Sequence, residues 1–229
     1  MSHRLFIILL FFMFRLSWSQ HCEYKTRIIE DELQGRYEFI DSAAYEKHKK
    51  IAEKFIDFTP ANEQKIITTY PKTFKLNDSC YTFNKKFTYS TTNYRRILKA
   101  CNINGSVPKE SLGYQFKGIY FNHVLIEVSG YEHWGYLSVD LENEETLYTL
   151  GKPLSSKGKT AISYSNYYSE EEITITDLKI NKQYTIGIED LVTAESYVIK
   201  DVYYLKLTSN MRPNCYKKIK YLKLQLTDQ

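Results

Sequence analysis

Apolar and polar residues alternate most clearly between Glu172 and Leu207. Three segments there carry an apolar residue at every second position: Ile173 and Ile175, then Tyr184, Ile186 and Ile188, then Tyr203, Leu205 and Leu207. A two-residue period is typical of a β-strand that buries one face and exposes the other. We therefore expect three half-buried strands here, whose outward face carries Thr174, Thr176 and Thr185.

The segment that joins the first two of these strands indicates a tyrosine corner. Leu178 precedes Tyr184 by six residues, and the residues between them are mostly polar and turn-forming. In a tyrosine corner the ring packs beneath the bend and the hydroxyl bonds to backbone upstream. The spacing therefore predicts that Leu178 and Tyr184 lie in one hydrophobic core.

The same alternation indicates more strands on both sides of this region. Those before it are expected at Val124–Val128, Leu137–Leu141 and Thr146–Leu150, with a loop over residues 152–159. The last segment, Ile219–Leu226, alternates lysine with apolar residues. Because lysine on an exposed strand discourages pairing with another chain, we expect an edge strand protected by Lys218, Lys220 and Lys223.

The amino-terminal part is expected to combine strands with one amphipathic helix. Gly35–Ile40 has strand-like alternation, and Asp41 or Ser42 can cap a helix that follows. Apolar residues then recur at helical spacing until Pro60. A solvated surface is the preferred role of the helix's lysines, and contact with an anionic membrane or glycan is the alternative. More strands are expected at Lys65–Tyr70 and Tyr81–Tyr89.

The segment Met1–Ser19 has the features of a secretory signal peptide. It contains Arg4 and no acidic residue, then an apolar run over Leu5–Phe14, then small residues before an expected cleavage after Ser19. This apolar run is too short to span a bilayer, which takes about twenty residues in a helix. We therefore expect a secreted, extracellular protein without stable membrane insertion.

Charge and length limit the remaining possibilities. The formal net charge of +4 falls to +2 when Arg4 and Arg15 leave with the signal peptide. A nearly neutral chain lacks the basic surface that nucleic-acid binding requires, so we expect no nucleic-acid partner. We divide the chain into a signal peptide (1–19), an α+β region (20–107), a β-sandwich (108–209) and a basic strand (210–229).

Four cysteines remain in the mature chain, and they favour two disulfides with three possible connectivities: Cys22, Cys80, Cys101 and Cys215. We prefer Cys80–Cys101, because residues 81–89 and 95–100 resemble the arms of a hairpin. Cys22–Cys215 would then join the two ends. The alternative is that residues 93–100 form a helix. Two glycosylation sequons begin at Asn77 and Asn104, which implies exposed loops beside the cysteines.

Residues 111–209 resemble a fibronectin type III domain. The most specific match is Ile173–Ile186, which is similar to the family's E strand, its leucine and the tyrosine that opens strand F. Strands B, C and G would be Val124–Val128, Leu137–Leu141 and Tyr197–Leu207. The resemblance implies an antiparallel β-sandwich, and a jelly roll or another immunoglobulin-like sandwich would produce a similar pattern. We thus expect a mainly β chain with a smaller α+β amino-terminal region.

The sequence shows no catalytic signature, and we expect neither an enzyme nor a cofactor. Gly158-Lys159-Thr160 ends like a phosphate-binding loop, but Pro153 stands where its first glycine would be. His123 and His133 are more consistent with surface histidines than with a metal site. No metal ligand is therefore assigned.

The segment 164–172 is the predicted binding site. Tyr164, Tyr167 and Tyr168 are interleaved with serine and asparagine, a composition found in adaptable binding loops. Three acidic residues follow and would favour a basic partner: Glu170, Glu171 and Glu172. A plain polar loop is the alternative.

These observations together favour a secreted, disulfide-linked, glycosylated binding protein. It would recognise an extracellular protein or glycan through its β-sandwich loops, without catalysis. The alternative is a lipocalin-like β-barrel that carries a small apolar ligand. A filled sandwich core would favour the binding protein, and a large closed apolar cavity would favour the carrier.

Overall fold

The computed structural model describes residues 24–56, 58–61, 63–77, 80–89, 92–101, 113–130, 133–143, 145–155, 157, 159–209 and 219–227. The expected signal peptide, Cys22, Cys215 and Asn104 lie outside these residues.

The described strands form four antiparallel sheets, so the expected mainly β class is confirmed. Sheet A contains, in spatial order, β1 (Thr26–Asp31), β13 (Lys182–Glu189), β12 (Glu170–Asp177), β11 (Thr160–Tyr167) and β10 (Leu154–Ser155). Sheet B contains β14 (Leu191–Ile199), β15 (Val202–Ser209), β16 (Ile219–Leu226) and β2 (Gly35–Ile40). Sheet C contains β6 (Gly113–Tyr120), β7 (His123–Gly130), β8 (His133–Asp140) and β9 (Thr146–Thr149). Sheet D contains β3 (Lys75–Asn77), β4 (Cys80–Tyr89) and β5 (Thr92–Cys101).

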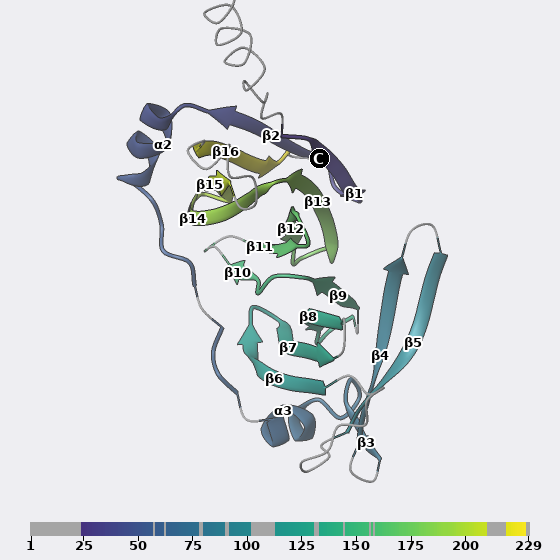
Figure 1. Cartoon of the computed structure of the whole chain (residues 1–229). Helices are drawn as coiled ribbons and strands as arrows, with labels where there is room; N and C mark the ends of the chain where they lie inside the picture. The colour runs from purple at the N-terminus through teal and green to yellow at the C-terminus, as the bar shows by residue number, and fades with distance from the viewer. Residues whose placement is uncertain are drawn as a thin grey trace, which may run out of the picture.

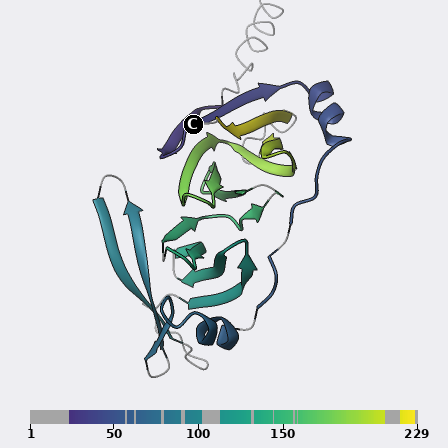
Figure 2. The same cartoon turned by 180° about the vertical axis from the view of Figure 1, so that it is seen from behind.

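Sheets B, A and C are stacked in that order, and the β4–β5 hairpin projects beside the stack (Figures 1 and 2). Sheets A and B pack face to face in a β-sandwich-like arrangement around one apolar core, which includes Ile173, Ile175, Tyr184, Ile186, Tyr203, Leu205, Leu222 and Leu224. Helix α3 (Glu63–Thr69) covers the far face of sheet C, where Ile66 and Ile67 pack against Val124, Ile126 and Leu137. Sheet A is therefore the middle layer.

Because sheet C covers the second face of sheet A, the expected outward threonines are buried. Thr174, Thr176 and Thr185 are only 3–4% exposed. The Thr174 hydroxyl lies 3.0 Å from that of Thr185, and Gln183 Nε2 donates to Thr176 Oγ1. The prediction that these residues face solvent is wrong, since a two-residue period does not distinguish water from a polar second layer.

The expected tyrosine corner is also wrong. Leu178 packs with Leu125 and Ala161 between sheets A and C, whereas Tyr184 lies in the core between sheets A and B. Residues 178–181 form a tight turn between two neighbouring strands of one sheet, and Asn181 has a φ of 54°. Leu178 and Tyr184 consequently lie on opposite faces of sheet A.

Strand pairing differs from that of a fibronectin type III domain. In such sandwiches strands B and C lie in opposite sheets, as do E and F. Here the segments assigned to B and C are neighbours in sheet C, and those assigned to E and F are neighbours in sheet A. The expected strand G is divided between β14 and β15, which a two-residue turn with positive φ at Lys200 and Asp201 connects. The assignment of these strands is therefore wrong, although the β-sandwich-like packing remains.

The carboxyl-terminal strand has the expected bounds but not the expected position. β16 pairs with β15 on one side and with β2 on the other, so it is an interior strand. Its leucines, Leu222 and Leu224, face the core. Lys223, which lies between them, pairs with Glu38 of β2, and Tyr221 on the outer face packs against Tyr45. The lysines of this segment therefore do not mark the edge of the sheet.

The amino-terminal segment passes along all three stacked sheets. β1 extends sheet A and β2 extends sheet B. Helix α2 (Ser42–Lys49) follows, and Asp41 caps it as expected by accepting from the Ala44 amide. Isolated bridges then join Glu53 to sheet B, Ile56 to sheet A and Thr59 to sheet C.

Two expectations in this segment fail. The helix ends at Lys49 and does not continue to Pro60, and residues 63–69 form helix α3 where a strand was expected. Ile66 and Ile67 are buried against sheet C, so tertiary packing overrides the strand preference of this β-branched sequence. The described amino-terminal region thus contains two helices instead of one.

Candidate functional site

The predicted tyrosine loop is mostly strand. Residues 164–167 belong to β11, and a two-residue turn at Tyr168–Ser169 leads into β12. Tyr164 is half-buried against the core between sheets A and B, and its hydroxyl lies 3.0 Å from that of Ser196. Tyr164 therefore has a structural role, while Tyr167 and Tyr168 remain exposed at the tip of the hairpin.

Trp134 joins these two tyrosines in an exposed cluster, which we call the aromatic patch. The ring centroids of Trp134 and Tyr167 are 5.3 Å apart, and those of Tyr167 and Tyr168 are 4.5 Å apart. Trp134, Tyr167 and Tyr168 are 42%, 39% and 76% exposed. Trp134 is at the start of β8 in sheet C and Tyr167 at the end of β11 in sheet A, so the patch joins two layers.

The main chain beneath the patch is tightly supported. The Tyr148 hydroxyl donates to the carbonyl oxygen of Trp134 at 2.5 Å. Tyr148 crosses Gly135, where an added Cβ would lie 2.7 Å from the Tyr148 ring and hydroxyl. Gly135 also has a φ of +150°, which side chains rarely adopt. Glycine is thus required for Tyr148 to hold the Trp134 backbone.

Tyr168 occupies a backbone conformation that favours glycine or asparagine. Its φ is 58°, within the left-handed region. Such a conformation costs a residue other than glycine roughly 1 kcal/mol or more. An exposed tyrosine at this position contributes little to the core, so its ring is a candidate for binding.

The three predicted acidic residues have different environments. Glu170 accepts two hydrogen bonds from the Arg27 guanidinium, whose pKa this contact raises. Glu171 is buried on the opposite face of its strand and accepts from the Thr193 amide at 2.9 Å. Burial raises the pKa of both Glu171 and Glu172. The expectation that all three attract a basic partner is wrong for Glu171, which is inaccessible.

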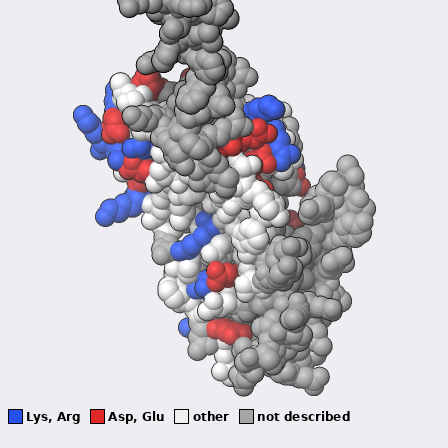
Figure 3. Space-filling model, in the orientation of Figure 1, with Lys and Arg blue, Asp and Glu red and all other residues white. Residues whose placement is uncertain are grey.

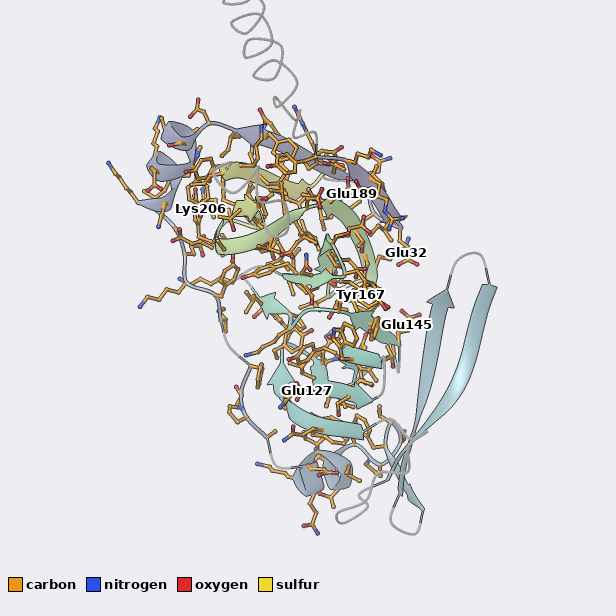
Figure 4. All side chains as sticks on the ribbon, in the orientation of Figure 1. Glu32, Glu127, Glu145, Tyr167, Glu189 and Lys206 are labelled. Atoms are coloured by element: carbon orange, nitrogen blue, oxygen red, sulfur yellow. The ribbon has the colours of Figure 1, made fainter. Side chains whose placement is uncertain are left out.

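Further carboxylates lie along the same edge of the molecule. Figure 4 shows Tyr167 at this edge between Glu32 and Glu189 on one side and Glu145 on the other. Basic residues lie over α2 at the upper left of Figure 3 and again at the upper right near β1, in both places interspersed with acidic ones. Lys49 at the end of α2 forms an ion pair with Glu195.

A buried polar network lies between sheets A and C. His123 Nε2 contacts Asn181 Oδ1 at 2.7 Å, and Asn181 Nδ2 donates to Asp140 Oδ2 at 2.5 Å. Because the Asn181 amide nitrogen donates to Asp140, its oxygen must accept, so Nε2 carries the histidine proton. Burial lowers the pKa of His123, and its Nδ1 atom is buried without a hydrogen-bond partner. His123 is therefore not the surface histidine that we expected.

A hollow of about 430 Å³ opens at one end of the sandwich formed by sheets A and B. Its walls include Leu33, Asp177, Lys200 and Asp201. Thr160 in this wall donates to Asp201 Oδ1 and lies 2.6 Å from the Tyr203 hydroxyl. These hydrogen bonds join two wall residues, Thr160 and Asp201, to each other and to the buried Tyr203 beside them.

The remaining predicted residues are placed only in part. β4 and β5 form the expected hairpin, and its register sets Cys80 directly opposite Cys101. Asn77 ends β3. Within the residues that the structure describes, no group of three or more histidine, cysteine, aspartate or glutamate side chains is arranged to hold a metal ion.

Sequence reasoning found Tyr167 and Tyr168 but missed their partners. Trp134 lies in β8 and Tyr167 in β11, whereas Arg27 lies in β1 and its partner Glu170 in β12. No local pattern connects residues on such distant strands. The sequence did offer one signal for Trp134, a tryptophan next to a glycine. No local pattern indicated that Arg27 would lie at the predicted binding site.

None of the helices in the described part of the chain is long and apolar enough to cross a membrane. Comparisons with models of protein families, with curated proteins and with solved structures found no match.

Proposed function

We propose that this chain is a secreted, non-catalytic binding protein that recognises an extracellular protein or glycan through the aromatic patch. The observation that carries the proposal is the exposed contact of Trp134, Tyr167 and Tyr168 across two layers. Tryptophan and tyrosine provide large contact areas with few rotamers to immobilise, and they dominate binding hot spots.

The support beneath the patch favours binding over an accidental cluster. A surface that is already ordered loses less conformational entropy when its partner binds. The Tyr148 hydroxyl fixes the Trp134 main chain, and the Trp134 ring packs against that of Tyr167. The apolar core in which side chains of sheets A and B pack on one another also supports the binding protein over the carrier.

Secretion, disulfides and glycans belong to the same proposal. The signal-like segment Met1–Ser19, the opposed Cys80 and Cys101 and the two sequons are mutually consistent in an extracellular chain. Amino-terminal sequencing and thiol titration of the secreted protein test them. Two or more reactive thiols in the native protein would contradict the disulfide proposal.

The binding proposal is tested by retention of the mature protein on a preparation of extracellular matrix and cell surfaces. Trp134→Ala and Tyr168→Ala should each weaken retention at least tenfold and leave the thermal midpoint nearly unchanged. Phe39→Ala is the matched control, because Phe39 is 44% exposed and lies on β2 of sheet B. Equal retention of all three variants and the wild type would place the binding site elsewhere.

A further inference from the structure

We infer that the partner of the aromatic patch is a neutral sugar unit of an extracellular glycan. This inference rests on the proposed function and names the ligand class for the same site. Four properties of the patch carry it: the ring geometry, the polar groups beside the rings, the surrounding charge and the area.

The ring geometry suits a small ring-shaped ligand. The planes of Tyr167 and Tyr168 meet at 75°, and Trp134 is inclined to Tyr167 by 44°. Together the rings form a corner instead of a flat surface. A sugar ring has faces made of C–H groups, which carry slight positive charge and pack on the electron-rich faces of aromatic rings.

Polar groups lie beside the rings where sugar hydroxyls would be. Tyr167 is directly opposite Glu170 in the register of β11 and β12, and Ser165 is opposite Glu172. Glu170 holds the Arg27 guanidinium, whose side chain is 65% exposed. Carboxylate oxygens accept from hydroxyls, and the Arg27 guanidinium N–H groups that do not bond to Glu170 can donate to them, which suits the hydroxyls of one sugar.

The surrounding charge opposes an anionic ligand. Glu32, Glu145 and Glu189 flank Tyr167 along this edge (Figure 4), and Glu189 pairs in register with Glu170. Among the described residues, Glu170 already engages the Arg27 guanidinium, and Lys25 lies beside Glu189, whose amide donates to the Lys25 carbonyl oxygen. A sulfated or carboxylated glycan would be repelled by these carboxylates, whereas a neutral one would not.

The area of the patch favours a glycan over a folded protein. A stable protein interface buries about 800 Å² on each partner. From the exposed fractions and a full area of about 150–250 Å² for each ring, the patch offers roughly 250–400 Å². This area covers one or two sugar units and is less than what a protein partner needs.

The test uses the retention assay with soluble competitors. Neutral competitors are dextran, galactomannan, laminarin and glycol chitin, and anionic competitors are heparin and polygalacturonate. We expect at least one neutral polysaccharide to release the wild type, or periodate oxidation of the surface to abolish retention by at least tenfold. The same treatments should not change the residual binding of Trp134→Ala.

The outcomes separate this inference from the proposed function. Retention that depends on Trp134 and Tyr168 but survives periodate and every neutral competitor would overturn the inference of a glycan ligand. The proposal that the chain is a binding protein would still stand. Release by heparin alone would overturn the inference that the sugar ligand is neutral. Absence of retention before any treatment would overturn both. Circular dichroism of each variant confirms that it has folded.

Discussion

The polar face of sheet A shows how single residues set the energetics of this molecule. Thr174 and Thr185 are neighbours across β12 and β13, and their hydroxyls lie 3.0 Å apart under sheet C. A buried hydroxyl that loses its partner retains the cost of its lost contact with water. The two threonines therefore act as a pair.

Thr174→Val should lower the free energy of unfolding by about 1–3 kcal/mol, because it leaves the Thr185 hydroxyl without its partner. The double variant Thr174→Val, Thr185→Val should recover most of that loss, since the two new side chains have the same shape and pack on each other. Thr59→Val, at an exposed threonine, is the control. Urea denaturation measures these proteins together with the single variant Thr185→Val, and a loss in the double variant equal to the sum of the two single losses would contradict the pairing.

His123 makes stability depend on pH. Burial lowers its folded pKa below the ordinary value of 6.5, against the opposing effects of Asn181 and Asp140. The unfolded chain then binds more protons than the folded chain at pH values from about 6.5 down to the folded pKa. Stability from this residue is complete above about pH 6.5 and decreases as the pH falls.

The free energy of unfolding should therefore decrease more for wild type than for His123→Gln between pH 7.5 and pH 5.5. The slope from one histidine is at most about 1.4 kcal/mol per pH unit. Comparison of the two proteins removes the contributions of Glu171 and Glu172, whose raised pKa values act in the opposite direction. Identical pH slopes would mean that His123 does not titrate differently on folding.

At the scale of elements, alternation located the strands but not their partners. Gly35–Ile40 and Ile219–Leu226 have the expected bounds, because each alternates apolar and polar residues over most of its length, although the alternation of Ile219–Leu226 shifts phase at Tyr221-Leu222. Their pairing with each other joins a strand near the start of the described chain to one at its end, and no local pattern encodes it. The same limit explains the wrong edge strand, the wrong sandwich order and the unexpected partners of Tyr167.

One close contact between two strands explains why Gly35 is a glycine, which the alternation of apolar and polar residues does not explain. A Cβ at Gly35 in β2 would lie 2.2–2.4 Å from three ring atoms of Tyr184 in β13. Tyr184 is buried in the core between sheets A and B, so its ring has no room to move. The absence of a side chain at Gly35 therefore allows the first residues of β2 to approach sheet A.

Gly35→Ala should destabilise the protein by about 1–3 kcal/mol, as overpacking of a filled core does. The neighbouring exposed substitution Arg36→Ala should change stability by about 0.5 kcal/mol or less. Adding Tyr184→Leu to Gly35→Ala should cost less than the same change in the wild type, because the smaller side chain relieves the contact. A Gly35→Ala protein as stable as Arg36→Ala would mean that Tyr184 does not fill this space.

At the scale of the whole molecule, the amino-terminal segment ties the layers together. β1 completes sheet A, β2 completes sheet B and α3 covers the apolar face of sheet C. A fragment of residues 108–209 would lack all three elements and β16 as well. It would expose core residues on sheets B and C, including Leu205, Val124 and Ile126.

We therefore expect residues 108–209 alone to be unfolded or aggregated, although this fragment has the length of an independent domain. The mature chain should unfold in one transition, because each layer shares strands or bridges with the amino-terminal segment. Circular dichroism and tryptophan fluorescence during urea denaturation test this, since fluorescence reports Trp134 in sheet C and circular dichroism reports all sheets. Two separated transitions, or a fragment with dispersed amide resonances, would show that the layers fold independently.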